Sequence, residues 1–205
     1  TQNGFSMASS ANNTFVSNNA SFNIKSGFYI ISSIFNNFTG NYAYNNTISG
    51  FYFITSSNFN NLSSNLAYNN SQYGFGIQTS SNNTIVSNNV SFNLLSGVYL
   101  LTNANSNNLT SNLVYNNTKH GFLINASSGT TFTSNNASFN LQEGFIFVSA
   151  SSNSTLRHNN AYNNTGNGFT LSASVSAVFV NNTAFFNTLN GFKLDAGANT
   201  SNFSN

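Results

Sequence analysis

Hydrophobic residues along this chain recur with a period of 23 or 24 residues. A glycine followed by Phe or Val occurs nine times, at Gly4, Gly27, Gly50, Gly74, Gly97, Gly121, Gly144, Gly168 and Gly191. A large apolar residue stands one and three positions after each glycine, and Ala or Val stands seven positions before each glycine from Gly27 onward. Within these short runs the apolar positions alternate with others, which is typical of β-strands and too short for helices.

Short strands that recur once per period predict a solenoid in which each period forms one coil. Each strand then pairs with its equivalent one coil away, about 4.8 Å along the axis. We therefore expect an all-β chain, a parallel β-helix of about nine turns of 23–24 residues that forms a single domain over residues 1–205. A leucine-rich repeat would need a helical half, which the pattern lacks. We expect both ends to be uncapped, as in a fragment or a stacking unit.

Two columns of asparagine are complete in this frame. The first lies nine residues before the glycine and comprises Asn18, Asn41, Asn65, Asn88, Asn112, Asn135, Asn159 and Asn182. The second lies four residues before it and comprises Asn23, Asn46, Asn70, Asn93, Asn117, Asn140, Asn164 and Asn187. Asparagine tolerates the left-handed backbone of a corner, and its carboxamide can both donate to and accept from an identical neighbour. We expect both columns to form structural ladders at two corners.

The frame resembles a known repeat. Asn, Ala or Val, Asn and Gly followed by Phe or Val occur at the same spacing in NNASFNIKSGFYI at 18–30 and in NLVYNNTKHGFLI at 112–124. This pattern is similar to the pectin-lyase-like right-handed parallel β-helix repeat, and the resemblance covers essentially the whole chain. That family includes lyases, hydrolases, periplasmic binding proteins, tailspikes and surface proteins, so the resemblance implies a right-handed coil and does not specify a function.

Composition narrows the function classes. Only 3% of residues are charged and the net charge is +2, which is too little for a nucleic-acid footprint. The chain has no cysteine, and no apolar run approaches the roughly 20 residues of a membrane span. We therefore expect no nucleic-acid partner, no membrane span in this segment and no cofactor. Because few groups titrate between about pH 3 and pH 8, we also expect stability to depend little on pH.

Candidate chemistry is sparse. Glu143 and Asp195 lie about two turns apart in different columns, and His120 and His158 also occupy different columns. General acid–base catalysis needs a pair within reach, and a metal site needs several ligands together. The sequence therefore predicts no catalytic residue, no metal site and no enzyme. A polysaccharide-cleaving enzyme would need a cluster of carboxylates.

Asparagine also supplies N-x-S/T sequons, which are acceptors for N-glycans in secreted proteins. None of the asparagines in the two ladder columns lies in a sequon. The candidate glycosylation sites are Asn12, Asn19, Asn37, Asn45, Asn61, Asn69, Asn82, Asn89, Asn108, Asn116, Asn125, Asn136, Asn153, Asn163 and Asn181. We expect covalent N-glycans to coat the surface.

Side chains two and four residues after the glycine should point away from the core. Several of these are apolar, and together they predict a contiguous apolar stripe, larger than an isolated rod normally exposes. The candidate lateral interface comprises Tyr29, Ile31, Tyr52, Ile54, Tyr99, Leu101, Leu123, Ile146 and Val148. The stripe indicates self-association, by lateral packing or end-to-end stacking, or cover by another segment of a longer chain.

These patterns favour an extracellular, N-glycosylated structural protein, a component of a surface filament, surface layer or adhesin stalk. Its composition, rich in Asn, Ser, Thr and Tyr, resembles that of surface proteins of thermophilic archaea. The alternative is a non-catalytic carbohydrate-binding β-helix module that uses exposed tyrosines such as Tyr29, Tyr52 and Tyr99 as platforms for sugar rings.

Overall fold

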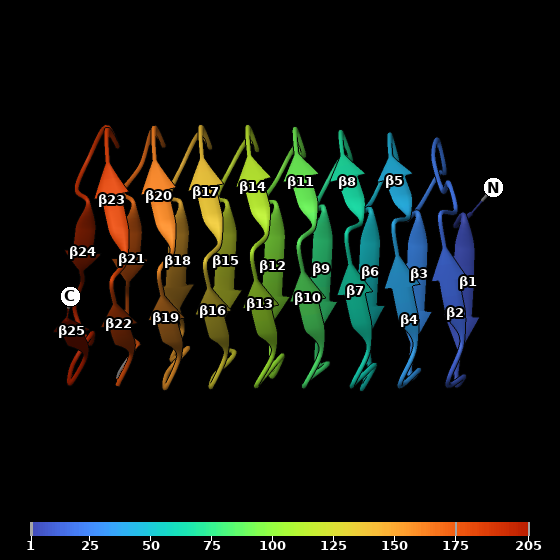
Figure 1. Ribbon diagram of the computed structural model, residues 1–205, viewed down its shortest axis with the longest axis horizontal. Helices are drawn as coiled ribbons and strands as arrows, with labels where there is room; N and C mark the ends of the chain where they lie inside the picture. Colours follow the sequence, from blue (N-terminus) through green and yellow to red (C-terminus); the bar gives the residue numbers. More distant parts are fainter. Residues whose placement is uncertain (1, 175, 205) are drawn as a thin grey trace.

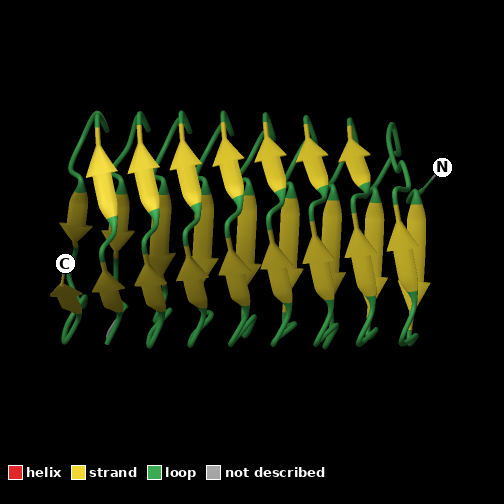
Figure 2. Cartoon of the chain, viewed as in Figure 1, coloured by secondary structure: helices red, strands yellow, loops and turns green. Residues whose placement is uncertain are grey.

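The computed structural model describes residues 2–174 and 176–204, and over these residues it confirms the parallel β-helix (Figure 1). The chain winds into coils that stack along one long axis, with the two termini at opposite ends. Most coils contribute three short strands, joined by tight turns (Figure 2). No α-helix occurs in the described residues.

The first sheet has nine parallel strands, each beginning at the residue that follows the recurring glycine. Its strands are β1 (Phe5–Ala8), β3 (Phe28–Ile31), β6 (Phe51–Ile54), β9 (Phe75–Gln78), β12 (Val98–Leu101), β15 (Phe122–Asn125), β18 (Phe145–Val148), β21 (Phe169–Leu171) and β24 (Phe192–Leu194). Buried and half-buried side chains alternate along most of them, so one face packs in the core and the other faces outward.

The second sheet also has nine strands and the third has seven. The second comprises β2 (Thr14–Val16), β4 (Asn37–Thr39), β7 (Asn61–Ser63), β10 (Thr84–Val86), β13 (Asn108–Thr110), β16 (Thr131–Thr133), β19 (Thr155–Arg157), β22 (Val178–Val180) and β25 (Asn202–Ser204). The third comprises β5 (Tyr42–Tyr44), β8 (Leu66–Tyr68), β11 (Asn89–Ser91), β14 (Leu113–Tyr115), β17 (Asn136–Ser138), β20 (Asn160–Tyr162) and β23 (Thr183–Phe185).

The coils stack in register. Phe28 pairs with Phe51, and Phe122 pairs with Phe145, one coil apart in the first sheet. Their rings stack nearly parallel, with centroids 4.7 Å and 4.5 Å apart. This distance is the spacing of neighbouring strands, so ring stacking costs no distortion of the sheet. Files of buried phenylalanine therefore run along the axis, interrupted in the first sheet by Val98.

Both asparagine ladders are confirmed, and they lie at corners of the coil. In the first ladder, Asn112 Oδ1 accepts hydrogen bonds from the backbone N–H and from Nδ2 of Asn88, both 3.0 Å long. Asn112 Nδ2 donates onward to Asn135 Oδ1 at 2.9 Å and back to the carbonyl of Ile85 at 2.8 Å. The second ladder repeats this pattern, as from Asn93 to Asn117 and from Asn117 to Asn140.

The backbone conformation at these corners differs from the expectation. The ladder asparagines are not left-handed; the residue before each of them is, for example Ser87 at φ 54° before Asn88 and Asn116 at φ 54° before Asn117. The left-handed residue turns the chain, and the asparagine that follows it then ties the corner to the next coil. The prediction of corners at the two asparagine columns is confirmed, but the left-handed residue is the one before each asparagine and not the asparagine itself.

A third corner carries a shorter ladder that the sequence analysis missed. The ladder begins with the backbone N–H of Asn13, and the side-chain oxygens of Asn36, Asn60, Asn83 and Asn107 each accept a hydrogen bond from the residue one coil before. The column continues as Thr130, Ser154 and Ala177, which are also buried. Because amides fill only part of it, the column does not stand out as a complete asparagine repeat.

Candidate functional site

The outer face of the first sheet carries the predicted apolar stripe. Side chains such as Tyr52, Leu123 and Ile146 alternate with buried core residues and are half-buried, so they point outward as expected. The same holds for Tyr29, and the stripe ends at Thr170 and Lys193. That this stripe forms a lateral interface stays a prediction.

Four tyrosines cluster on this face, and we call Tyr29, Tyr52, Tyr73 and Tyr99 the tyrosine platform. The rings of Tyr29 and Tyr52 lie 6.1 Å apart, and those of Tyr73 and Tyr99 lie 4.7 Å apart. Gly76 seats them: a Cβ at this position would lie 2.7 Å from Tyr52 Cδ2 and 3.5 Å from Tyr73 Cδ2. The glycine therefore makes room for two aromatic rings to lie against the sheet.

Hydrogen bonds fix the platform hydroxyls. Tyr52 donates from its hydroxyl to Gln78 Oε1 at 2.7 Å, and Asn125 Nδ2 donates to the Tyr99 hydroxyl at 3.3 Å. Burial raises the pKa of Tyr52, and burial together with the neighbouring tyrosines raises the pKa of Tyr73 to about 12. Both phenols therefore stay neutral hydrogen-bond donors at physiological pH.

A groove of about 300 Å³ opens at the N-terminal end of the platform. It is lined by Asn3, Lys25, Ser26, Tyr29, Ile48 and Tyr52. An aromatic wall with a few polar groups and one cation is a common composition for a ligand pocket. The lining shows that the residue just before each glycine and the residue two after it share this outer surface, since Ser26 and Tyr29 both contribute.

The column just before each glycine brings His120 and Glu143 together. They stand one coil apart, and His120 Nδ1 lies 3.0 Å from Glu143 Oε2, with side chains 14% and 18% exposed. Asn167, one coil further on, donates from Nδ2 to Glu143 Oε1 at 3.2 Å. This corrects the sequence analysis, which compared Glu143 with Asp195 and His120 with His158 and overlooked the 23-residue spacing between His120 and Glu143.

The hydrogen bond from His120 is the main cause that lowers the pKa of Glu143, while burial opposes it. A carboxyl whose pKa is lower in the folded chain stabilises the fold above its ordinary pKa, and that contribution is lost as the pH falls through the lowered value. We expect the free energy of unfolding to fall slightly below about pH 5, by under about 1 kcal/mol because the pair is partly solvated. Denaturant unfolding of the native chain and of Glu143→Gln at several pH values tests this; an equal acid dependence in both contradicts it.

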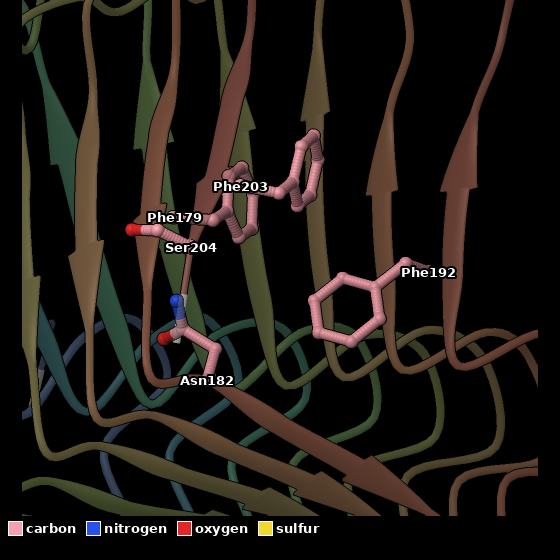
Figure 3. A pocket seen from close by; sticks show the side chains of 5 residues that line it. All are labelled: Phe179, Asn182, Phe192, Phe203 and Ser204. Carbon is pink, nitrogen blue, oxygen red and sulfur yellow. The ribbon is translucent and has the colours of Figure 1, made fainter.

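A second hollow of about 300 Å³ lies at the C-terminal end of the stack, where Figure 3 shows its lining. Phe203 stacks on Phe179 at 4.6 Å and meets Phe192 edge-on at 5.9 Å. Asn182 and Ser204 complete the lining. These residues continue the ring files and the ladder that other coils bury, so we assign no ligand to this hollow.

The candidate glycosylation asparagines are separated from the ladders by burial. Nine are exposed and six are half-buried. The exposed ones are Asn12, Asn19, Asn61, Asn69, Asn82, Asn108, Asn116, Asn153 and Asn181, and the half-buried ones are Asn37, Asn45, Asn89, Asn125, Asn136 and Asn163. Ladder asparagines are buried along the middle of the stack. The exposed sequon side chains reach the surface, whereas Oδ1 of Asn89 and of Asn136 is buried, and whether any sequon carries a glycan stays a prediction.

Two further expectations concern metals and membranes. Within residues 2–174 and 176–204, no three His, Cys, Asp or Glu side chains converge as they would around a metal ion. In the same part of the chain, no helix is long and apolar enough to cross a membrane.

Solved structures share this architecture. The A-module of the Azotobacter vinelandii mannuronan C-5 epimerase AlgE6 superposes with a TM-score of 0.80 at 19% identity, over 94% of this chain and 58% of its own. The periplasmic alginate epimerase AlgG gives 0.67 at 20% identity, over 87% of this chain and 47% of its own. The Dettilon tailspike protein gives 0.54 at 11% identity, over 97% of this chain and 61% of its own. No curated protein sequence matches the chain.

This comparison contradicts the prediction that the chain is not an enzyme. Structures that share the fold over most of this chain are epimerases, so the fold is one on which enzymes occur and the prediction loses its support. His120 and Glu143 also supply one acid–base pair that the prediction had denied. A likeness at this identity shows the fold alone, and it covers about half the length of those enzymes.

The sequence matches the family described as right handed beta helix region over residues 1–137 and 96–205, which together span the whole chain. The parallel coils, the in-register files of phenylalanine and the asparagine ladders are the structural form of that repeat. The chain belongs to the right-handed β-helix family.

Proposed function

We propose that this chain is an extracellular polysaccharide-binding β-helix whose contact surface is the outer face of the first sheet. The observation that carries the proposal is the tyrosine platform, which presents Tyr52, Tyr73 and Tyr99 beside a groove on one face of the rod. Aromatic rings pack against the apolar faces of sugars, and neutral hydroxyls and amides bond sugar hydroxyls.

Two further features support a chain-like ligand. Four successive coils each contribute one tyrosine to the platform, so a polymer that lies along the axis would meet one ring after another. Two cations also lie at the edge of this sheet, since Lys25 precedes β3 and Lys119 precedes β15, whereas Lys193 in β24 is paired with Asp195 at 3.2 Å. Such cations suit a polymer with carboxylates, and the similar structures include enzymes named for mannuronan and alginate.

Binding of mannuronan, alginate and a neutral polysaccharide by calorimetry tests the proposal. We expect Tyr52→Ala and Tyr99→Ala each to weaken polymer binding by about tenfold or more, as for aromatic residues at other binding surfaces. Tyr42→Ala is the matched control, because Tyr42 is 47% exposed but lies in β5 of the third sheet. Equal losses in all three variants, or no binding by the native chain to any polymer offered, would overturn the proposal.

A second candidate function is an N-glycosylated structural component of a surface filament, surface layer or adhesin stalk. It is favoured by the exposure of the sequon asparagines beside ladders that exclude sequons. The intact mass of the chain purified from its native source tests it, with a mass above that of the polypeptide as the expected result. A mass equal to that of the bare polypeptide would contradict N-glycosylation.

A further inference from the structure

Phenylalanine occupies strained positions on the surface. Six phenylalanines have φ between 54° and 58°, and all six side chains are 48–81% exposed. They are Phe22, Phe35, Phe59, Phe92, Phe139 and Phe186. A left-handed backbone costs a bulky residue on the order of 1–2 kcal/mol, and an exposed ring recovers little of this by burial.

At the corner of the second asparagine ladder, where four of these phenylalanines lie, the fold does not require phenylalanine. Asn69, Asn116 and Asn163 take φ of 53–55° at equivalent positions of other coils, and asparagine tolerates this conformation. Phe92, Phe139 and Phe186 take φ of 54–55° at that corner instead. These phenylalanines combine a strained backbone with an exposed ring, although asparagine takes the same conformation in other coils with less strain. This combination indicates a binding role for the rings.

The rings alternate with polar coils along this corner, which lies between the third and the first sheet. Each of the coils that ends at Gly97 and at Gly144 carries an exposed phenylalanine and, two residues later, an exposed leucine. We call these projections teeth, and the three that alternate with polar coils are Phe92 with Leu94, Phe139 with Leu141, and Phe186. Phe22 with Ile24 forms a fourth tooth at this corner, separated from the others by the two polar coils of Asn45 and Asn69. The intervening coils carry short polar side chains, which we call slots, and these are Asn69 with Ser71, Asn116 with Thr118, and Asn163 with Thr165.

Teeth and slots therefore alternate, with equivalent teeth two coils or about 9.6 Å apart. The slots at Asn116 and Asn163 have an aromatic wall, because Phe92 meets Tyr115 edge-on at 6.0 Å and Phe139 meets Tyr162 edge-on at 5.8 Å. A tooth of another molecule with the same period would fill each slot and cover its ring.

We propose that this corner joins two copies of the chain as an antiparallel dimer. A two-fold axis between the coils of Gly121 and Gly144 exchanges these three teeth with these three slots, and the coils of Phe22 and Asn45 lie beyond the exchanged region. The exchanged pairs are Phe92 with Asn163, Phe139 with Asn116, and Phe186 with Asn69. Such an isologous interface is self-complementary and closes at two copies.

Charge and size agree with this arrangement. The same axis exchanges the coil that carries exposed Lys119 with the coil that carries Glu143, so the two copies of Lys119 do not face each other. The interdigitated region spans six coils, roughly 24 Å, and stable interfaces bury about 1,000 Å² or more. A single row of teeth makes a narrow contact, so we expect a dimer that dissociates on dilution.

Sedimentation velocity of the unglycosylated chain over a range of concentrations tests the proposal. The native chain is expected to dimerise, and Phe139→Asn to raise the dimer Kd by about tenfold or more. Because asparagine is the residue of neighbouring coils at this corner, Phe139→Asn should fold with undiminished thermal stability. Phe35→Asn is the matched control: Phe35 has the same φ and is 53% exposed at a different corner, so its dimer should equal the native one.

Cross-linking fixes the orientation. A mixture of the Leu94→Cys and Thr165→Cys chains should form a disulfide-linked heterodimer, since the antiparallel axis brings these coils together. A parallel pair shifted by one coil would not. A native chain that is monomeric at every concentration, or a Phe139→Asn chain that dimerises as well as the native one, would overturn the proposal. Weakened polysaccharide binding by Phe139→Asn in a monomeric chain would assign the teeth to a sugar polymer instead.

Discussion

Replacing Asn112 by alanine is expected to lower the free energy of unfolding by about 4 kcal/mol. The substitution removes two hydrogen bonds that Asn112 Nδ2 donates, to Ile85 O and Asn135 Oδ1, and two that its Oδ1 accepts from Asn88. All four partner atoms lie in the buried interior of the ladder, where water cannot replace the lost bonds. Equilibrium unfolding in denaturant measures the difference.

Asn108→Ala is the control for this prediction. Asn108 lies in the same coil, in β13, and its side chain is exposed. Its side-chain oxygen accepts a hydrogen bond from Thr110 Oγ1 at 3.1 Å. We expect it to change the unfolding free energy by less than about 0.5 kcal/mol. Similar small effects at Asn112 and Asn108 would mean that the ladder does not hold the coils together.

Replacing Gly144 by alanine is expected to cost at least about 3 kcal/mol, because the new methyl group has no room. Its Cβ would lie 2.7 Å from the backbone oxygen of Gly168 and 2.9 Å from Ala161 Cβ. Both atoms belong to the next coil, so the methyl group can be accommodated only if the two coils move apart. Contacts between neighbouring coils are what stabilise a solenoid. Thermal unfolding followed by circular dichroism measures the loss.

Gly129→Ala separates crowding from backbone strain. Gly129 has φ of +66°, but a Cβ there would come no closer than 3.5 Å to Ser106 Oγ. Only the left-handed penalty of about 1 kcal/mol applies at this position. A Gly129→Ala chain less stable than Gly144→Ala would show that the recurring glycines serve conformation rather than close approach of the coils.

Features repeated in every coil could be predicted from the sequence. The glycine frame, the phenylalanine files and the two complete asparagine columns are visible because each residue recurs at a fixed offset, and stacking at the strand spacing requires identical neighbours to pack well. The glycine itself recurs because the backbone of the next coil leaves no space for a side chain, as at Gly144.

Features confined to one or two coils were harder to predict. The pair of His120 and Glu143 occurs once, and its only signal is a spacing of one coil between two unlike residues. Tyr73 joins the tyrosine platform from the column before the glycine, which holds serine in neighbouring coils such as those of Ser49 and Ser96. A periodic analysis averages over such positions, although functional residues are those that depart from the repeat.

In-register stacking of successive coils is the claim on which the ladders, the platform and the teeth all depend. A crystal structure of the chain tests it most directly. We predict that Asn88, Asn112 and Asn135 lie in one file with side-chain bonds of about 3 Å from coil to coil, with Phe122 stacked on Phe145. Coils displaced by one residue would turn each buried phenylalanine outward and separate these amides, and that arrangement would contradict the account.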